Sequence, residues 1–396
     1  MKLNCVFPTH FEAQIKDAIA FLKPYTKRAY LVGGSVRDLC LDEPLHDLDI
    51  EVYDIAPDAF EALMKQVGAV GVGKSFFVYK LGNIDFSLPR VERKSGVGHK
   101  AFEVHVCQDE KEASRRRDFS VNAMMLNIFS GELLDFWGGK EAIERKCLAI
   151  IDEESFKEDS LRVLRAMQFS ARLGFKIESK SVEVMRHISL SDLSKPRILW
   201  EFEKLFKASY LHYGLFYMYQ LNLFEKCFTC KVENRFFEIA RELLRSKQNF
   251  EEALRPYYFV YIVANRLKQE PLQWFRMLDA PNHYLQTFKY QPFFEGEISD
   301  EMLLHVSLEL PICAWLGNYR EGIKERACEL GIWDEIFSGN VNVQEVIRDG
   351  FSGRDIGEEL RRRRIEKIRL LVKLVLKEGK APKVRGHSAE ENPVLT

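Results

Sequence analysis

Two aspartates, Asp47 and Asp49, stand two residues apart in a segment that alternates acidic and apolar residues from His46 to Val52. Such alternation is typical of a half-buried strand with all its carboxylates on one face. The spacing separates the two Cα atoms by roughly 6.5–7 Å, so both side chains could share a pair of Mg²⁺ ions about 3.5–4 Å apart. We therefore predict Asp47 and Asp49 to be catalytic residues and metal ligands in transfer at a phosphate. The alternative is an edge strand whose acids only face water.

A Gly-Gly turn precedes the aspartates and favours the functional interpretation. Gly33 and Gly34 follow a short apolar segment, residues 30–32, and let the backbone turn tightly and approach a ligand. Residues 35–41 are predicted to form one or two helical turns, whose amides would face a phosphate, with Arg37 available for a triphosphate. We predict nucleotide binding by Gly33, Gly34 and Arg37.

A second group of polar residues lies at helical spacing further along the chain. Asp159, Arg162 and Arg165 stand three apart on one face of a predicted helix. Asp159 can accept from the exocyclic amine of cytosine or adenine, and Arg162 can donate to the neighbouring ring acceptor. Uracil and guanine would leave these groups unsatisfied, which can reject a wrong base by about 10⁴–10⁵. The pattern indicates selection of CTP and ATP by protein side chains; the alternative is an N-capped helix with a solvent ion pair.

A third candidate group lies between a predicted helix and a strand. Arg117 could contact a phosphate, and Asp118 and Asn122 could hydrogen-bond the ribose hydroxyls and so favour NTP over dNTP. Asp85, on another predicted strand, could supply a further carboxylate, although an aspartate on an edge strand more often only faces water.

Periodicity predicts how these residues are positioned. Strands are predicted over 28–33, 47–53, 76–82, 84–88, 101–107 and 124–129, with a helix near 57–67 and another ending around Arg117. After about residue 145 the strand signals fade and helical spacing takes over, punctuated by prolines. The fold class is therefore a mixed α/β head followed by an all-helical remainder.

Composition sets limits on the function. The 396 residues suffice for two or more domains, 46% of them are hydrophobic, and the net charge is −1, which would not by itself attract nucleic acid. An RNA site would need local basic clusters, and these occur at 90–100, 115–117, 361–364 and 377–385. For 361–364, a solvated helix face is an equal alternative.

Cysteine usage and hydropathy bear on the compartment. The eight cysteines are scattered and the N-terminus lacks a charged segment followed by a long apolar core, so we expect a cytoplasmic protein without a disulfide framework. Cys227 and Cys230 have no second pair at zinc spacing and are predicted to be a reduced structural pair. The longest apolar runs are too short to span a bilayer, so no membrane contact is expected.

Several of these segments together resemble a known family, the class II tRNA nucleotidyltransferases (CCA-adding enzymes) and the related bacterial poly(A) polymerases. The motifs that carry the resemblance are 31–38 with Asp47 and Asp49, the flexible loop 88–100, the ribose-binding motif 116–123 and the base-reading helix 158–165. They occur in the family's order. Similarity is strong from about residue 28 to 206 and weak beyond, except for 350–364.

The resemblance implies an architecture and an activity. It implies a nucleotidyltransferase head over 1–146, a helical neck with the base-reading helix over 147–210, and a helical body and tail over 211–396 that bind tRNA. It also implies Mg²⁺-dependent addition of C, C and A to the 3′ end of tRNA from CTP and ATP, with pyrophosphate release. A loop at 91–100 would help the pocket change from C to A addition. No appended hydrolase domain and no obligate protein partner are expected.

Other activities remain open at this point. The same catalytic parts would serve an enzyme that adds only CC, only A, or poly(A) tails. A non-catalytic RNA-binding paralogue would keep the same fold.

One residue departs from the family pattern. Many relatives carry an Arg three residues after the position of Arg165, where this chain has Gln168. Arg172, one helical turn further on, is the candidate replacement for a triphosphate contact. Arg197 and Glu201, at i,i+4, are expected to brace the base-reading helix.

Overall fold

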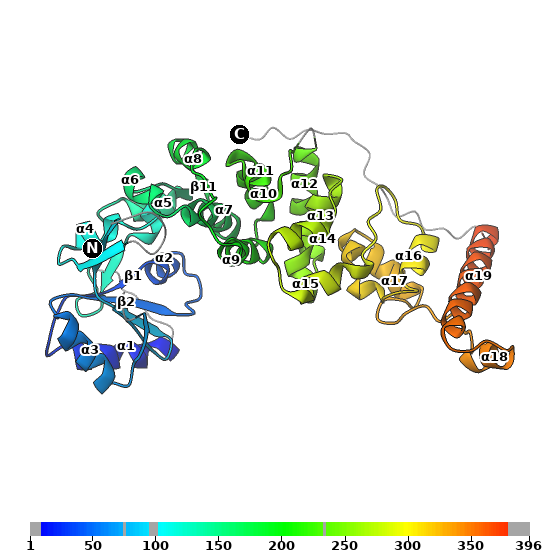
Figure 1. Cartoon of the computed structure of the whole chain (residues 1–396), viewed down its shortest axis with the longest axis horizontal. Coiled ribbons are helices and arrows are strands. Elements are labelled where there is room, and N and C mark those ends of the chain that lie inside the picture. The colour runs from blue at the N-terminus through cyan, green and yellow to red at the C-terminus, as the bar shows by residue number, and fades with distance from the viewer. Residues whose placement is uncertain (1–8, 74–76, 95–101, 233–234, 379–396) are drawn as a thin grey trace. The chain divides into compact units, whose positions relative to one another are not determined.

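The computed structural model describes residues 9–73, 77–94, 102–232 and 235–378. These residues form two compact units, one reaching to Leu205 and including Tyr213–Thr229, the other comprising Phe206–His212 and the chain from Cys230 onward. The main sheet lies in the first unit, where Figure 1 labels β1 and β2. Its strand order is β3-β4-β5-β2-β1-β8-β9. Its strands are β1 (Ala29–Val32), β2 (Leu48–Val52), β3 (Val70–Gly73), β4 (Val78–Leu81), β5 (Ile84–Ser87), β8 (Met125–Asn127) and β9 (Leu133–Leu134).

The register of the sheet separates an apolar face from a face that carries charge. Phe86 of β5 is paired with Ile50 of β2 and Tyr79 of β4, so these side chains share one face. Two helices cover this face, α1 (Thr9–Leu22) and α3 (Pro57–Gln66): Phe21 meets Phe86 edge-on at 5.5 Å, and Phe60 meets Tyr79 at the same distance. Because neighbouring residues on a strand point to opposite faces, Asp49 and its register partner Asp85 lie on the other face.

Strand β2 is interior to the sheet, paired with β1 on one side and β5 on the other. The edge-strand explanation for Asp49 therefore does not apply, and it does not apply to Asp85 either, since β5 lies between β4 and β2. The predicted strands correspond to β1, β2, β4, β5, β7 (Phe102–Val106) and β8, and the predicted helix near 57–67 corresponds to α3.

The prediction of a surface loop beginning at Val91 is wrong for the first part of that segment. Residues Arg90–Lys94 form strand β6, which pairs antiparallel with β7. Cross-strand pairing creates this strand although its own sequence lacks an apolar alternation. The remainder of the predicted loop, from residue 95, lies outside the described residues. Strand β3 and helix α1 were not predicted. Strands β10 (Cys147–Leu148) and β11 (Lys176–Ile177) lie beyond residue 145, where strand signals had faded.

Helices complete the first unit. They are α2 (Gly34–Cys40), α4 (Glu110–Arg115), α5 (Gly139–Glu144), α6 (Glu153–Lys157), α7 (Leu161–Leu173), α8 (Ser179–Arg186), α9 (Lys195–Phe206), α10 (Leu211–Gln220) and α11 (Leu223–Phe228). The last residue of α9 and the first two of α10 belong to the second unit. Phe119, which follows α4, meets Phe156 of α6 at 5.7 Å and Phe169 of α7 at 6.1 Å, both edge-on. This aromatic contact joins α7 to the part of the chain that contains the sheet.

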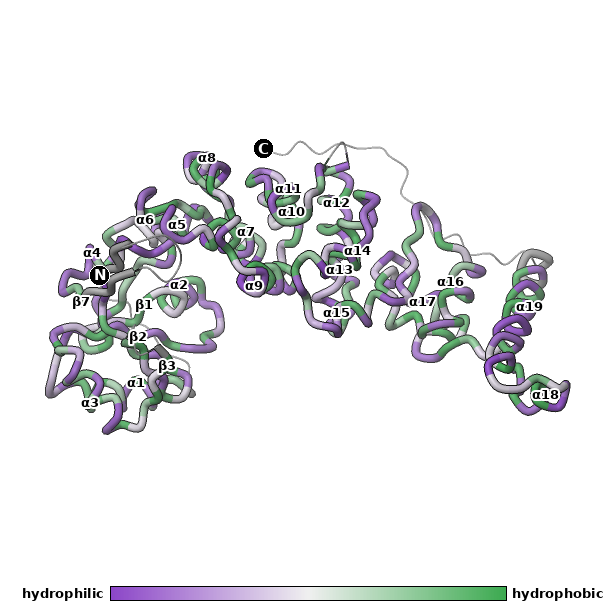
Figure 2. Tube along the Cα trace, in the orientation of Figure 1, coloured by the Kyte–Doolittle hydropathy of each residue, from purple (hydrophilic) through white to green (hydrophobic). Residues whose placement is uncertain are grey.

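The second unit is helical around its own apolar core. Its remaining helices are α12 (Phe236–Ser246), α13 (Arg255–Arg266), α14 (Pro271–Met277), α15 (Asn282–Thr287), α16 (Asp300–Val306), α17 (Ile323–Glu329), α18 (Val343–Arg348) and α19 (Arg354–Glu378). Trp315 and Ile368 are among the buried residues of one core cluster. Apolar and hydrophilic residues alternate along α19 (Figure 2). The mixed head followed by helices confirms the predicted fold class.

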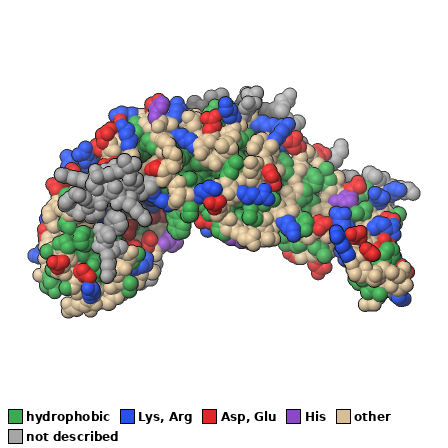
Figure 3. All heavy atoms as spheres, in the orientation of Figure 1, with side chains coloured by type: hydrophobic (Ala, Val, Ile, Leu, Met, Phe, Trp, Pro, Cys, Tyr) green, Lys and Arg blue, Asp and Glu red, His purple; other side chains and the backbone are tan. Residues whose placement is uncertain are grey.

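Surface charge is mixed. On the face drawn in Figure 3, Lys and Arg side chains are interspersed with Asp and Glu. The basic run on α19 is engaged with carboxylates: Arg361 with Glu309 at 3.1 Å, Arg362 with Glu359 at 2.7 Å, and Arg363 with Glu359 at 2.8 Å. This favours the charged helix face over a dedicated RNA site. Within the part of the chain that the structure describes, no helix is both long and apolar enough to cross a membrane.

Candidate active site

A pocket of about 590 Å³ lies in the first unit. Its lining comes from the start of α2, the turn into β2, the segment after α4, helix α7 and one residue of α9. It includes every predicted site residue: Gly33, Gly34, Arg37, Asp47, Asp49, Arg117, Asp118, Asn122, Asp159, Arg162 and Arg165. Asp85 is not among the lining residues. Segments far apart in the sequence thus converge on one site, as the motifs predicted.

Ser35 fixes the position of the two aspartates. Its buried Oγ donates to the backbone carbonyl of Asp47 at 3.3 Å and accepts from the backbone N–H of Asp49 at 3.1 Å. One hydroxyl therefore joins the first turn of α2 to the entry of β2 and sets the relation of the carboxylate-bearing residues. Ser35 could not be identified as a site residue from the sequence, because only the fold reveals its contact with a backbone more than ten residues away.

Asp49 has an unusual electrostatic environment. Its side chain remains accessible to solvent, but the surrounding walls of the site remove much of its hydration and raise its pKa to about 6. Arg117 opposes this shift, whereas the negative charges of Asp47 and Asp85 add to it. A divalent cation would relieve this repulsion, so the paired carboxylates suit such a ligand. Among the described residues no set of three or more His, Cys, Asp or Glu side chains is arranged to hold a metal ion.

Gly33 allows the backbone to pass between charged side chains. It has φ +68° and lies directly before α2, a conformation that side chains with Cβ rarely adopt. A Cβ added here would lie 3.1 Å from Nη1 of Arg117 and 3.7 Å from Oδ2 of Asp49. Glycine thus keeps the turn close to both a cation and a carboxylate of the site, which explains the first residue of the Gly-Gly pair.

Arg37 is a buried member of the site, with 3% of its surface exposed. Its Nη1 donates to Oδ1 of Asn122 at 2.7 Å, and its Nε and Nη2 lie 2.8 and 2.7 Å from Oδ1 of Asp38. The guanidinium predicted to meet a triphosphate is therefore largely occupied by protein acceptors. In this geometry Arg37 ties helix α2 to the segment that contains Asn122.

Asp118 connects that segment to α7. Its Oδ1 accepts from Nδ2 of Asn122 at 2.9 Å, and its Oδ2 accepts from Nε of Arg165 at 2.7 Å. Burial opposes the charge of Asp118, but Arg165 and Asn122 stabilise it and hold the pKa of this carboxyl below its ordinary value. Together with Arg37, these contacts form a continuous polar network from α2 to α7.

The predicted base-reading residues are held in fixed positions. Nη1 of Arg162 donates to the carbonyl of Ser155 at 2.5 Å, and its Nη2 donates to the carbonyl of Arg116 at 2.6 Å. Asp159 precedes α7 rather than lying on its face, and its Oδ1 accepts from the backbone N–H of Leu161 at 3.2 Å. Asp159 is therefore placed in the pocket by the loop before α7, and not by the 3.6-residue period of the helix.

Helix α9 supports this arrangement, as predicted for Arg197. Its Nη2 lies 3.1 Å from Oδ1 of Asp159. The carboxylate of Glu201 instead accepts a hydrogen bond from Nζ of Lys204, at 2.7 Å. The predicted brace thus comes from Arg197, while Glu201 holds Lys204 at the edge of the pocket.

Glu51 departs from the expected row of accessible acids on β2. It is 1% exposed and accepts from the Tyr53 hydroxyl at 3.1 Å. Its Oε1 lies 3.4 Å from Arg116 and 3.8 Å from Arg117. Burial with these partners makes Glu51 a support that holds Arg117 beside Asp49 and Gly33.

Comparisons with known families match two segments of the chain. The family described as "Poly A polymerase head domain" matches residues 29–149, and that described as "Probable RNA and SrmB- binding site of polymerase A" matches residues 174–229. The first of these segments contains the sheet and the paired carboxylates.

Individual relatives agree with this result. The chain is 34% identical to a CCA-adding enzyme of Streptococcus agalactiae over 224 residues, covering 54% of each chain, and 27% identical to that of Streptococcus uberis over 330 residues, covering 80% of this chain and 77% of the relative. The chain spans about half the length of several of the curated relatives it matches.

Solved structures share the fold. The CCA-adding enzyme of Thermotoga maritima complexed with tRNA has a TM-score of 0.63 at 22% identity, covering 95% of this chain and 97% of the other. That of Bacillus stearothermophilus in complex with CTP has a TM-score of 0.60 at 21% identity, covering 95% and 100%. Fold and site together define a protein with a poly(A) polymerase-type head followed by helices. Residues 29–149 belong to the poly(A) polymerase head-domain family, and this match and the relatives support the resemblance to CCA-adding enzymes and bacterial poly(A) polymerases that the motifs carry.

Proposed function

We propose that the protein is a template-independent RNA nucleotidyltransferase that adds C, C and A to the 3′ end of tRNA from CTP and ATP, releasing pyrophosphate. The observation that carries the proposal is the convergence of a carboxylate pair, a Gly-Gly turn and a base-reading pair on one pocket. Relatives named CCA-adding enzymes support the assignment. Since only about half of some relatives is matched, the activity rests on the site.

Asp47 and Asp49 are proposed to hold Mg²⁺. When bound, the metal would activate the terminal 3′-OH for attack on the α-phosphate and screen the leaving pyrophosphate. Ser35 keeps the two carboxylates in register, and Arg117 adds positive charge beside them. Reactions of this kind depend on positioning and charge neutralisation, so no covalent protein nucleophile is needed.

Asp159 and Arg162 are proposed to select the base. Arg197 orients the carboxylate of Asp159, and two backbone carbonyls orient the guanidinium of Arg162. Side chains held in this way lose little further freedom when a nucleotide binds. Asp118 and Asn122 are proposed to face the ribose, with their mutual hydrogen bond keeping both in place.

The larger organisation completes the proposal. Residues 1–146 would be the catalytic head, 147–210 the neck, and 211–396 a body and tail that bind tRNA, in a cytoplasmic protein. Part of the loop proposed to reshape the pocket, residues 95–100, and most of the basic tail segment, from residue 379, lie outside the described residues.

Extension of defined tRNA ends tests the function. Purified protein, Mg²⁺ and labelled transcripts ending before CCA, after C and after CC are incubated with CTP and ATP, separately and together. We expect all three to grow to one CCA end and expect Asp47→Ala to abolish growth. Stopping at CC, adding only A or making long A tails would select a partial or tailing enzyme. No extension of any end would reject the transferase and leave an RNA-binding role.

A further inference from the structure

Three arginines surround one aromatic ring in the candidate active site. The guanidinium carbons of Arg165, Arg37 and Arg172 lie 5.0, 5.1 and 5.9 Å from the ring centroid of Phe169. The ring face attracts each cation, but the cations repel one another. Such a cluster needs negative charge nearby.

The protein supplies that charge to two of the three. Arg37 is paired with Asp38 at 2.7 Å, and Arg165 is paired with Asp118 at 2.7 Å. Arg172 lines the same pocket and is exposed, so it is open to a ligand. It makes no hydrogen bond or ion pair with any described residue. The surrounding protein, which removes part of its hydration, and the positive charge of Arg37 lower the pKa of Arg172, while Asp38 and Glu201 act on it only at longer range. Its positive charge is the one that the cluster leaves without a direct partner.

Gln168, one helical turn before Arg172, is a second unsatisfied group. It lines the same pocket and is 1% exposed, and neither its amide nitrogen nor its amide oxygen has a hydrogen-bond partner among the described residues. Buried amides are normally paired. A cation without a direct partner and an unpaired amide therefore occur one turn apart on α7, in the pocket that Arg37 also lines.

The residues that neighbour Arg172 in the pocket indicate which kind of ligand it binds. Arg37 connects this part of the pocket to the Gly-Gly turn, since a Cβ on Gly34 would lie 3.4 Å from Nη2 of Arg37. The turn in turn adjoins Asp49 and Arg117. An anion near Arg172 would therefore lie in the same pocket as the proposed metal-binding carboxylates.

We propose that Arg172 binds the triphosphate of the incoming nucleotide, with Gln168 beside it as a second donor. The proposal rests on the proposed nucleotidyl transfer and names a phosphate-binding residue for it. Arg37 and Arg165, already neutralised, then act as positioning residues for the site. Guanidinium is suited to this role because it offers several N–H donors to phosphate oxygens.

The test replaces Arg172 and measures nucleotide binding and turnover separately. Arg172→Gln should weaken CTP and ATP binding in calorimetry by about 10–100-fold, the range for a lost hydrogen bond to a charged group, and raise the KM for both NTPs. CMP affinity, which does not depend on the terminal phosphates, and the KM for tRNA should stay unchanged. Arg172→Lys should retain part of the affinity. The double variant Gln168→Arg/Arg172→Gln, which moves the cation one turn along α7, should also recover part of it.

Arg145→Gln is the matched control, since Arg145 is 71% exposed on its side chain and, among the described residues, forms an ion pair with Glu141 alone. It should behave as wild type. Unchanged NTP binding by Arg172→Gln would overturn the proposal. A change in the KM for tRNA alone would also overturn it, because it would assign Arg172 to an RNA phosphate instead. If the wild-type protein extends no transcript, the proposed function fails instead, and CTP binding by the two proteins still tests the role of Arg172.

Discussion

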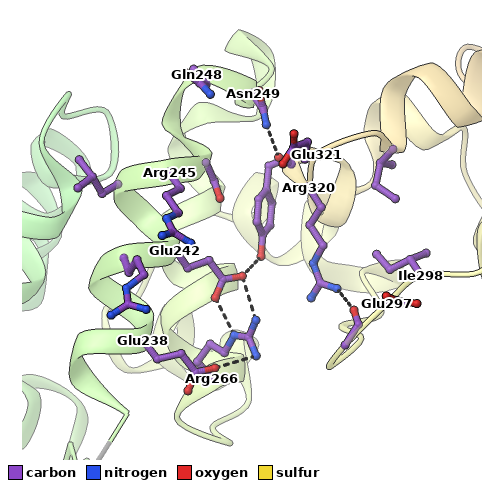
Figure 4. A pocket seen from close by; sticks show the side chains of 16 residues that line it. Glu238, Glu242, Arg245, Gln248, Asn249, Arg266, Glu297, Ile298, Arg320 and Glu321 are labelled. Carbon is purple, nitrogen blue, oxygen red and sulfur yellow. Dashed lines mark hydrogen bonds and ion pairs between the residues drawn. The ribbon is translucent and has the colours of Figure 1, made fainter. Parts of the chain in front are cut away.

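Two pockets, one in each compact unit, differ in size and in the arrangement of their charges. The pocket of the second unit measures about 1000 Å³, against about 590 Å³ for the candidate active site. Glu242 in the larger pocket accepts from the Tyr319 hydroxyl at 2.5 Å and from Nε of Arg266 at 2.7 Å, and Glu238 lies 3.4 Å from the same arginine (Figure 4). These opposite charges neutralise one another and join α12 to α13.

The smaller pocket instead collects like charges. Asp47 lies close enough to Asp49 to help raise the pKa of its carboxyl, and three guanidinium groups share the ring of Phe169. The protein leaves part of this charge without a partner. A fold that keeps such an arrangement is best explained by a ligand that carries metal ions and phosphates. Crowding of like charges around shared groups, rather than volume, therefore marks the smaller pocket as the candidate binding site.

The largest effect should come from removing one carboxylate of the smaller pocket. Asp49→Asn keeps the shape of the side chain but removes its charge, and we expect the single-turnover rate of nucleotide addition to fall by about 10³-fold or more. Circular dichroism should show an intact fold. A rate within tenfold of wild type would show that the carboxylate pair is not catalytic.

A comparable change in the larger pocket should affect stability instead. Glu242→Ala leaves Arg266, only 15% exposed on its side chain, without its closest partner. Removing one member of a buried ion pair costs about 3–5 kcal/mol. We expect the free energy of unfolding to fall by about 3 kcal/mol, since the pair is not fully buried, and CTP affinity at low temperature to stay the same. A matching loss of CTP affinity in a folded variant would break the distinction between the pockets.

Base selection should depend on Asp159. Asp159→Asn replaces one acceptor oxygen by a donor, so discrimination of CTP and ATP against UTP and GTP should fall by about 10²-fold. The measurement is the ratio of kcat/KM values for the four nucleotides on matched transcripts. An equal fall in all four values would instead assign Asp159 to general positioning.

Mg²⁺ binding should weaken at acid pH, over a pH range set by the pKa of Asp49. Because its pKa is about 6, the carboxyl is protonated below that pH and must lose the proton to bind a cation. Mg²⁺ affinity should fall by up to about tenfold per pH unit below 6 and level off above it. The same shift has the opposite sign for folding: the raised pKa adds stability at low pH that is lost as pH rises from about 4 to 6. Calorimetric titration from pH 5 to 8 measures the first effect, and Asp49→Asn should remove this pH dependence.

The smallest effect concerns Ser35. Ser35→Ala removes the hydroxyl that links Asp47 and Asp49, at a cost of about 1 kcal/mol, so kcat should fall by about fivefold while the KM for CTP changes little. Ser35→Thr, which retains the hydroxyl, is the control. A wild-type kcat in the alanine variant would show that β2 holds the aspartates without this link.

The sequence was most informative where chemistry is local. Asp47 and Asp49 follow the two-residue period of β2, and Arg162 and Arg165 follow the helical spacing of α7, so their placement in one pocket could be expected. Contacts between residues far apart in the sequence could not be predicted in this way. Strand β6 depends on pairing with β7, and Glu51 is buried because Tyr53, Arg116 and Arg117 surround it. Asp159 lies in the loop before α7, where its carboxylate pairs with Arg197, and the helical period that was expected to place it does not extend to this residue.

Hydrogen exchange with and without CTP and Mg²⁺ tests the central claim, that nucleotide binds in the smaller pocket. In the absence of tRNA the nucleotide is not consumed, so protection of backbone amides reports binding alone. We predict slower exchange in peptides covering residues 30–50 and 155–175, and unchanged exchange in peptides covering 236–250 and 315–323. Protection confined to the second pair of segments would contradict the account, because it would place the nucleotide in the larger pocket.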